Sequence, residues 1–212
     1  MKRLIALLAV CLAASCKKSP VEAAPDAGTV ADAGAVVTVR ERDIRAKVII
    51  TVAAPESPAL GQAFDAAFAE VERLDDVLSD WRDTSELGRL NQQSGQGPMQ
   101  VSAEMFELLQ TAYRLSEASG GAFDVTFASL AGLWSFKAEA PRIPTDEELA
   151  ARLPLVGFEA LKLDEKARTA EIARAGTRVG LGALGDGYAA LRASLALTAR
   201  GFPDHLVLIG GD

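Results

Sequence analysis

A glycine-rich string near the carboxyl-terminal end limits the folds open to this sequence. Residues 180–187 read Gly-Leu-Gly-Ala-Leu-Gly-Asp-Gly and precede a predicted helix. Glycines let a backbone come close to a ligand, and the free N–H groups at a helix start attract an anion such as a phosphate or pyrophosphate. The string also fits the Gly-x-Gly-x-x-Gly pattern of dinucleotide-binding, doubly wound sheets. Only one helix and one strand follow it, however, and Asp186 would place a negative charge beside a pyrophosphate. We therefore expect an anion-binding bend in another fold.

The hydrophobic patterning predicts a single α+β domain, a mixed β-sheet with packed helices, over residues 40–212. Four short segments rich in β-branched or apolar residues are predicted strands: 47–53, 161–164, 169–173 and 206–209. Helical periodicity and end signals predict four helices: 59–78, 102–120, 145–153 and one from the glycine string to residue 200. Ser102 is the predicted cap of the second helix, and Thr145 with Glu148 forms a capping box for the third.

The first 39 residues predict export. Residues 1–15 are a predicted secretory signal peptide, because Lys2 and Arg3 precede an apolar run shorter than the about 20 residues that span a bilayer. Small residues then lead to Cys16, whose thiol is a natural acceptor for diacylglycerol. Residues 16–39, rich in Ala, Pro and Gly, predict a flexible tether. We expect a lipoprotein of the cell envelope, facing the periplasm and anchored to a membrane; the alternative is an ordinary cleaved signal with a chance cysteine.

The composition argues against several kinds of site. Cys11 would leave with the signal peptide and Cys16 would carry lipid, so the folded part would have no thiol for a disulfide or a cysteine metal site. His205 is the only histidine and begins an apolar run, which favours a strand-edge residue over a catalytic one. The formal net charge of -7 argues against nucleic acid as a partner, because phosphate binding needs a basic face.

Several further segments occur in the order and spacing of a known family. Residues 75–91 contain Leu-Ser-Asp-Trp followed by Ser-Glu-Leu and Leu-Asn, residues 121–126 read Gly-Ala-Phe-Asp-Val-Thr, and residues 133–136 read Leu-Trp-Ser-Phe. Val156-Gly157, the glycine string with the Gly-Tyr-Ala that ends it, and the final Gly-Gly-Asp continue the order. From residue 40 to its end, the chain resembles the FAD:protein FMN transferases, often called the ApbE family.

The resemblance implies a flavin site. Trp81 matches the aromatic residue that lies against the FAD rings, where a flat side chain contributes by stacking; without the family, a core residue at a helix end is equally plausible. Asp124 is expected to accept hydrogen bonds, because a carboxylate in an apolar setting needs partners; the alternative is a structural turn residue. Asp186 matches a position that touches FAD and is otherwise an exposed loop residue. The implied FAD-binding residues are Ile44, Trp81, Ala122, Phe123, Asp124, Gly180 and Asp186.

The resemblance also implies a reaction. A threonine hydroxyl of a partner flavoprotein attacks the FMN-side phosphorus of FAD, AMP leaves, and the flavin becomes covalently attached. Such phosphoryl transfer requires neutralisation of the phosphate charge, usually by Mg²⁺. The family supplies one metal contact at the place of Ala183, where a main-chain carbonyl oxygen is a suitable ligand.

The chain departs from the family pattern at three places. Ile44-Arg45-Ala46 stands where the family has Met-Gly-Thr, and Gly180 stands where it has an aspartate. The family's final Asp and Thr metal ligands would follow residue 212, so we expect a fragment or a truncated protein. Two functions remain open, an incompletely represented FMN transferase and a non-catalytic FAD-binding lipoprotein, with a structural relic of the family as a third.

Overall fold

The structure, a computed structural model, describes residues 36–135 and 141–211. The predicted signal peptide, Cys16 and nearly all of the predicted tether therefore lie outside the described residues. Among the helices of these two stretches, none combines the length and the apolar character needed to cross a bilayer.

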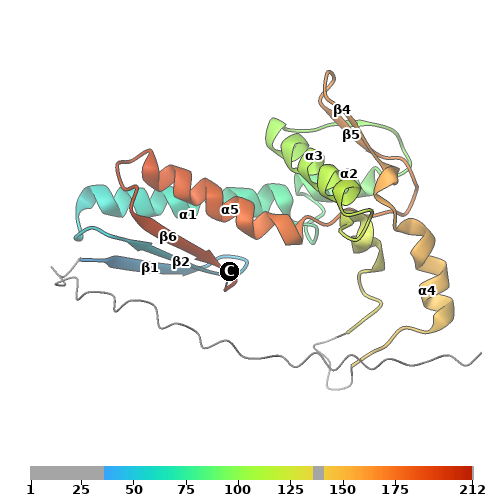
Figure 1. The fold of residues 1–212 in the computed structure, drawn as a ribbon, viewed down its shortest axis with the longest axis horizontal. Helices are drawn as coiled ribbons and strands as arrows, with labels where there is room; N and C mark the ends of the chain where they lie inside the picture. Colours follow the sequence, from blue (N-terminus) through green and yellow to red (C-terminus); the bar gives the residue numbers. More distant parts are fainter. Residues whose placement is uncertain (1–35, 136–140, 212) are drawn as a thin grey trace, which may run out of the picture. The chain divides into compact units, whose positions relative to one another are not determined.

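The first of two sheets has three antiparallel strands in the order β1-β2-β6 (Figure 1). β1 (Thr38–Asp43) and β2 (Lys47–Val52) form a hairpin, and β6 (His205–Ile209) pairs with the other edge of β2. Every second residue from Val48 to Val52 is buried, because successive side chains of a strand point to opposite faces. One face of this sheet is thus apolar and requires a cover.

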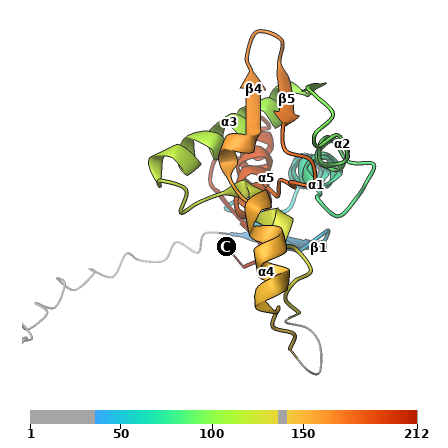
Figure 2. The same cartoon turned by 90° about the vertical axis from the view of Figure 1, so that its right-hand side faces the viewer.

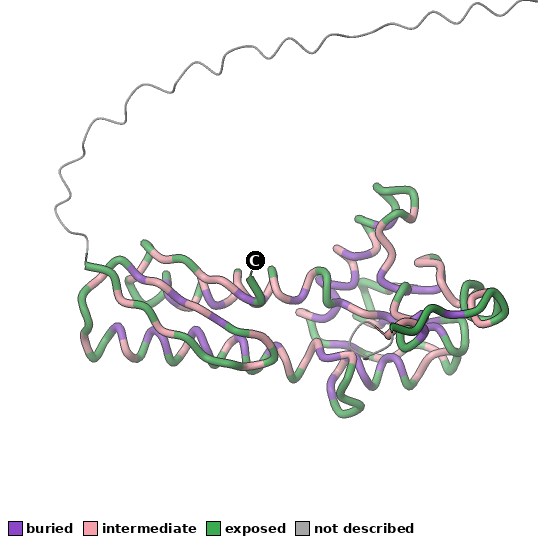
Figure 3. Tube along the Cα trace, turned by 90° about the horizontal axis from the view of Figure 1, so that it is seen from below, coloured by how far each residue is buried: buried purple, intermediate pink, exposed green. Residues whose placement is uncertain are grey.

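Two long helices, α1 (Pro58–Leu78) and α5 (Gly182–Thr198), provide that cover and pack against each other (Figure 1). α1 begins where the Ser57 hydroxyl accepts a hydrogen bond from the Leu60 N–H, which satisfies one of the free donors of a helix start. Its apolar face, which includes Phe64, is fully buried in this first core. Buried positions recur along the helices and strands in Figure 3.

The second sheet is also antiparallel and has the order β3-β5-β4. It consists of β3 (Met99–Gln100), β4 (Leu161–Asp164) and β5 (Thr169–Ile172). α3 (Ala103–Ala118) packs beside the β4–β5 hairpin (Figure 2). These elements enclose a second core.

The remaining elements are short. They are α2 (Glu86–Gln92), α4 (Asp146–Arg152) and three 3₁₀ segments, η1 (Val125–Leu130), η2 (Leu153–Leu155) and η3 (Phe158–Ala160).

The two cores meet near the end of α1 and the start of α5. Leu78 and Tyr188 pack against both of them. Leu181, the last residue before α5, is 1% exposed and belongs to the second core. This junction positions the candidate site.

The predicted α+β class is confirmed, and the strands are divided between two antiparallel sheets instead of one mixed sheet. The predicted helices at α1, α3 and α4 are present, and the Ser102 cap and the Thr145–Glu148 capping box form as expected. The sequence does not predict β1, β3 or α2.

One predicted boundary is wrong at the glycine string. Residues 182–187 form the first turns of α5 instead of a loop before it. Gly185 and Ala189 are buried, and Gly185 lies where a Cβ would touch Leu78 of α1 at 3.9 Å. Packing of α5 on α1 therefore favours a helix in this glycine-rich segment, although glycine disfavours helix.

Candidate functional site

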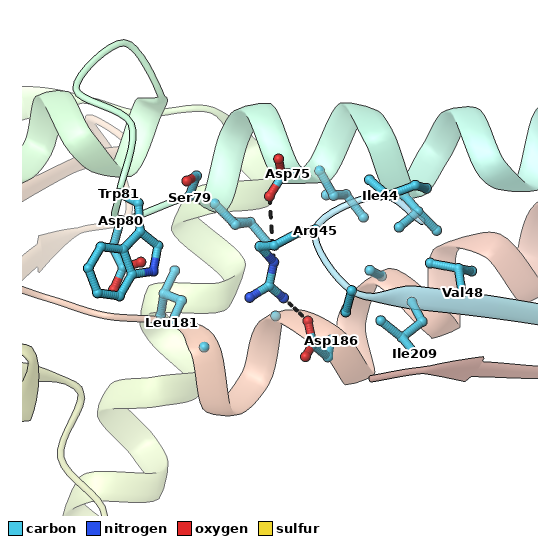
Figure 4. A pocket seen from close by; sticks show the side chains of 17 residues that line it. Ile44, Arg45, Val48, Asp75, Ser79, Asp80, Trp81, Leu181, Asp186 and Ile209 are labelled. Atoms are coloured by element: carbon cyan, nitrogen blue, oxygen red, sulfur yellow. Dashed lines mark hydrogen bonds and ion pairs between the residues drawn. The ribbon is translucent and has the colours of Figure 1, made fainter. Parts of the chain in front are cut away.

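A pocket lies where the end of α1, the β1–β2 turn and the start of α5 come together (Figure 4). Its mouth is open to solvent, and about 40 Å³ of the space inside it can be reached by water. Its wall is largely apolar and carries four charged side chains: Arg45, Asp75, Asp80 and Asp186.

Trp81 lies at the rim of this pocket, three residues after the end of α1. Its side chain is 81% exposed, so the alternative of a core residue at a helix end is contradicted. An uncovered aromatic face beside a pocket is suited to stacking on a flat ligand. Contact of Trp81 with FAD itself stays a prediction.

The β1–β2 turn contributes Ile44 and Arg45 to the pocket. Ile44, a predicted site residue, also packs against the first core. The Arg45 guanidinium forms ion pairs with Asp75 of α1 and Asp186 of α5 (Figure 4). Asp186 is therefore a helical, ion-paired residue, which contradicts the alternative of an exposed loop residue, and Arg45 offsets its negative charge.

Asp75 is a residue of this site that the sequence analysis missed. Its side chain is only 8% exposed, Arg82 binds its Oδ2 atom, and the Arg45 Nε atom lies 3.5 Å from its Oδ1 atom. A signal for it exists in the sequence, because Asp75 follows Phe64, Phe68 and Val71 on the apolar stripe of α1. An acidic residue at such a position must find polar partners in a partly buried place.

The start of α5 is open toward the pocket. The first N–H groups of a helix have no partner within the helix, and no side chain of the described residues caps α5. Gly182, its first residue, lines the pocket, and a Cβ built there would meet no atom within 4 Å. A helix start of this kind favours an anion, as the sequence predicts for the glycine string.

The Phe-Asp turn, residues 122–124, lies outside this pocket's lining. Asp124 caps η1, where its carboxylate accepts hydrogen bonds from the N–H and hydroxyl of Thr126 at 2.8 and 2.6 Å and from the Phe158 N–H at 2.9 Å. Phe123 packs against the second core, while Ala122 is exposed. The expected acceptor role of Asp124 is thus met by protein donors, and contact of these three residues with FAD remains a prediction.

Gly180 connects the Phe-Asp turn to the pocket. Its N–H donates to the Val125 carbonyl at 2.9 Å. A Cβ at this position would lie 2.9 Å from the Ala128 Cβ and 3.1 Å from an Asp80 carboxylate oxygen. The absence of a side chain at Gly180 is therefore required by packing, whatever its part in binding a ligand.

The described side chains do not form a cluster that would bind Mg²⁺. In residues 36–135 and 141–211, no group of three or more His, Cys, Asp or Glu side chains converges as metal ligands would. Ala183 is exposed in the first turn of α5, and carbonyl groups there point along the helix to the N–H four residues on. The Ala183 contact stays a prediction, and the residues present do not by themselves form a Mg²⁺ site.

His205 is the first residue of β6, as the sequence predicts for a strand-edge residue. Its Nε2 atom is 2.7 Å from the Ser194 Oγ atom and its Nδ1 atom is 2.7 Å from the Phe202 carbonyl oxygen. Both ring nitrogens thus have protein partners outside the pocket.

Comparison with known proteins relates most of the chain to one family. Residues 37–212 match the profile of the ApbE family. The FAD:protein FMN transferase of Vibrio cholerae serotype O1 is 33% identical over 144 residues, which are 67% of this chain and 42% of the relative. The protein of the same name from Salmonella typhimurium is 26% identical over 208 residues, 96% of this chain and 59% of the relative.

Solved structures agree with this relationship. The flavin transferase ApbE from Vibrio cholerae aligns with a TM-score of 0.71 and 28% identity over 83% of this chain and 58% of its own. The flavinyl transferase ApbE of Pseudomonas stutzeri, in its apo form, aligns with a TM-score of 0.73 and 25% identity. The alignment covers 83% of this chain and 59% of the Pseudomonas stutzeri chain. The present chain spans under half the length of the Vibrio cholerae curated relative.

Proposed function

This chain belongs to the ApbE family, and we propose that its pocket binds FAD as the donor for transfer of FMN to a protein. Transfer of flavin is what the names of its relatives state. The acceptor threonine, the release of AMP and the dependence on Mg²⁺ are parts of this proposal.

The proposal depends on one observation, the convergence of an exposed tryptophan and an open helix start on the same pocket. FAD has flat ring systems at both ends and a diphosphate between them. Trp81 offers a stacking surface for a ring. The N–H groups at the start of α5 offer partial positive charge to the diphosphate. The residues present therefore fit the chemistry of FAD.

In the proposed reaction the pocket holds the diphosphate while the partner protein approaches. The threonine oxygen forms a bond to the FMN-side phosphorus, the bond from that phosphorus to the bridging oxygen breaks, and AMP leaves with that oxygen. The threonine proton passes to a base that the described residues do not identify. The N–H groups at the start of α5 would stabilise the phosphate charge during this step.

A titration of the chain with FAD tests the binding. We expect Trp81→Ala to weaken FAD binding about tenfold, because it removes a stacking contact of about 1.4 kcal/mol. Ile143→Ala is the control, since Ile143 is also a large apolar residue that is 81% exposed, and it lies outside the pocket. If the unmodified chain has no affinity for FAD, the proposal is wrong.

Release of AMP distinguishes transfer from binding alone. The chain is incubated with FAD, Mg²⁺ and a flavoprotein that carries a target threonine, and AMP and protein-bound flavin are measured together. Equal amounts of both products are expected for a transferase. FAD binding without either product favours the second candidate, a non-catalytic FAD-binding protein, for which Gly180 and Ile44-Arg45-Ala46 in place of the family's residues are the motivating observations.

We also propose that the chain is a lipoprotein of the cell envelope. A signal peptide over residues 1–15, lipid attachment at Cys16 and a tether to residue 39 support this, all from the sequence. An enzyme held in this way would act on acceptors at or near a membrane surface that faces the periplasm.

A further inference from the structure

One carboxylate oxygen in the pocket has an unused capacity to accept a hydrogen bond. The Oδ1 atom of Asp75 is buried and makes no hydrogen bond with any of the described residues. The Oδ2 atom of the same carboxylate is bound by the Arg82 Nη2 atom at 2.5 Å. Buried polar atoms almost always have a partner, and those that lack one require an explanation.

The position of this oxygen points to a ligand. Asp75 lines the pocket, and Figure 4 shows its side chain on α1 pointing toward the Arg45 side chain, with which it is paired. Apart from the arginines that pair with it, its neighbours in the wall include the apolar residues Leu78 and Leu181. A donor that enters this place competes with little water, so a hydrogen bond to it is worth more than one at the surface.

The charges nearby restrict what the donor can be. Arg45 and Arg82 both form ion pairs with Asp75, so the negative charge of the carboxylate is already compensated. A metal cation or an amine would have to compete with the two guanidinium groups that already lie against this carboxylate. A neutral N–H group suits the site. The flat indole ring of Trp81 at the rim favours a donor that is carried on a ring, because two rings can stack.

We propose that Asp75 is a specificity-determining residue whose Oδ1 atom accepts a hydrogen bond from a ring N–H donor of the bound dinucleotide. This rests on the proposed function, because FAD is the assumed ligand. FAD carries two such donors, the N3–H of the flavin and the exocyclic amino group of adenine.

The variant Asp75→Asn tests the proposal with little change in shape. Arg82 donates to the oxygen that faces it, so the amide should keep its oxygen toward Arg82 and turn its NH₂ group to the pocket. An acceptor is thereby replaced by a donor. We expect FAD to bind at least tenfold more weakly, the loss that accompanies an unmade hydrogen bond to a charged group.

Asp76→Asn is the matched control. Asp76 is the next residue, also pairs with Arg82, and has a side chain that is 73% exposed and outside the pocket lining. FAD affinity within about threefold of the unmodified chain, a difference of about 0.6 kcal/mol, is expected for this variant. Equal affinities of the Asp75 and Asp76 variants for FAD would overturn the proposal.

Ligand analogues give a second measurement that does not depend on how the variant folds. FAD methylated at flavin N3 and FAD dimethylated at the adenine amino group each lack one ring donor. The unmodified chain is expected to bind one of the two at least tenfold more weakly than FAD, and that analogue identifies the ring. If it binds both as tightly as FAD, the inference fails while the proposed function stands; if it does not bind FAD at all, the proposed function fails.

Discussion

Gly180 shows at the scale of one residue how packing dictates an amino acid. The surroundings of its Cα leave no room for a side chain, since a Cβ would lie 2.9 Å from the Ala128 Cβ and 3.1 Å from an Asp80 oxygen. Gly182, two residues later, has open space in the same direction. Both glycines belong to the predicted anion-binding string, but only the second borders the pocket.

These two positions form a matched pair for a stability measurement. Gly180→Ala is expected to lower the free energy of unfolding by about 1–3 kcal/mol, the usual cost of forcing a methyl group into a packed site. Gly182→Ala is expected to change it by less than about 0.5 kcal/mol, as surface substitutions usually do. Urea denaturation of both variants measures the difference. Equal midpoints would show that the chain around Gly180 can relax to accept a Cβ.

At the scale of elements, Glu104 joins three helices. It lies in the first turn of α3 and accepts hydrogen bonds from Arg73 of α1 at 2.7 Å, and from Tyr188 and Arg192 of α5 at 3.0 and 2.9 Å. The hydrogen bond from Arg73 is the largest cause that lowers the pKa of Glu104 below its usual value. Burial raises the pKa of Tyr188. The cluster fixes α1, α3 and α5 against one another beside the junction of the two cores.

This cluster predicts a pH dependence of stability. Because the folded state lowers the pKa of Glu104, its contribution is complete above the unfolded pKa of about 4.3 and is lost as the pH falls through the folded value. Glu104→Gln should therefore reduce the free energy of unfolding by about 1–3 kcal/mol at pH 7 and approach the unmodified chain in acid. Thermal unfolding from pH 7 to pH 3 measures this.

Glu107→Gln serves as the control for the same helix. Glu107 is exposed, and within the described parts of the chain it has no ion pair. Its substitution should leave the pH profile of unfolding unchanged. A Glu104 variant whose stability stays below that of the unmodified chain by the same amount at pH 7 and at pH 3 would contradict the linkage.

The elements that the sequence predicts are those whose apolar period is regular. α1 and α3 have such a period and good caps, and both appear as expected. β1 is missed because Arg40 and Arg42 occupy its inward positions, where their guanidinium groups lie 5.0 Å from the Phe64 ring and 4.5 Å from the Phe68 ring. Cation–π contacts of this kind cover the helix without leaving a hydrophobic pattern.

The candidate site could be predicted in part. Motifs locate Ile44, Trp81 and Asp186, and the structure brings all three to one pocket. Arg45 and Asp75 are missed because their importance arises from the meeting of the β1–β2 turn with α1 and α5, which no local pattern records. Asp124 is predicted as an acceptor, but which donors it meets depends on the distant Phe158 segment.

At the scale of the whole molecule, the pocket lies at the junction of two cores. The first core forms between the β1-β2-β6 sheet and the α1–α5 pair, and the second surrounds α3 and the β4–β5 hairpin. Leu78 contacts both cores and also lines the pocket. A ligand bound there touches the segments that hold both cores, so FAD should raise the unfolding temperature of the whole domain by mass action.

The predicted attachment to a membrane concerns the chain as a whole and is tested in a bacterial host. If Cys16 receives diacylglycerol, the protein should partition into detergent and incorporate labelled fatty acid, and its mature mass should correspond to a chain that begins at residue 16. Cys16→Ala should abolish the label and release the protein from membranes. Cys11→Ala is the matched control, because Cys11 would be removed with the signal peptide and its loss should leave lipid attachment intact. An unlabelled chain, or one labelled equally with and without Cys16, would leave the ordinary cleaved signal as the better explanation.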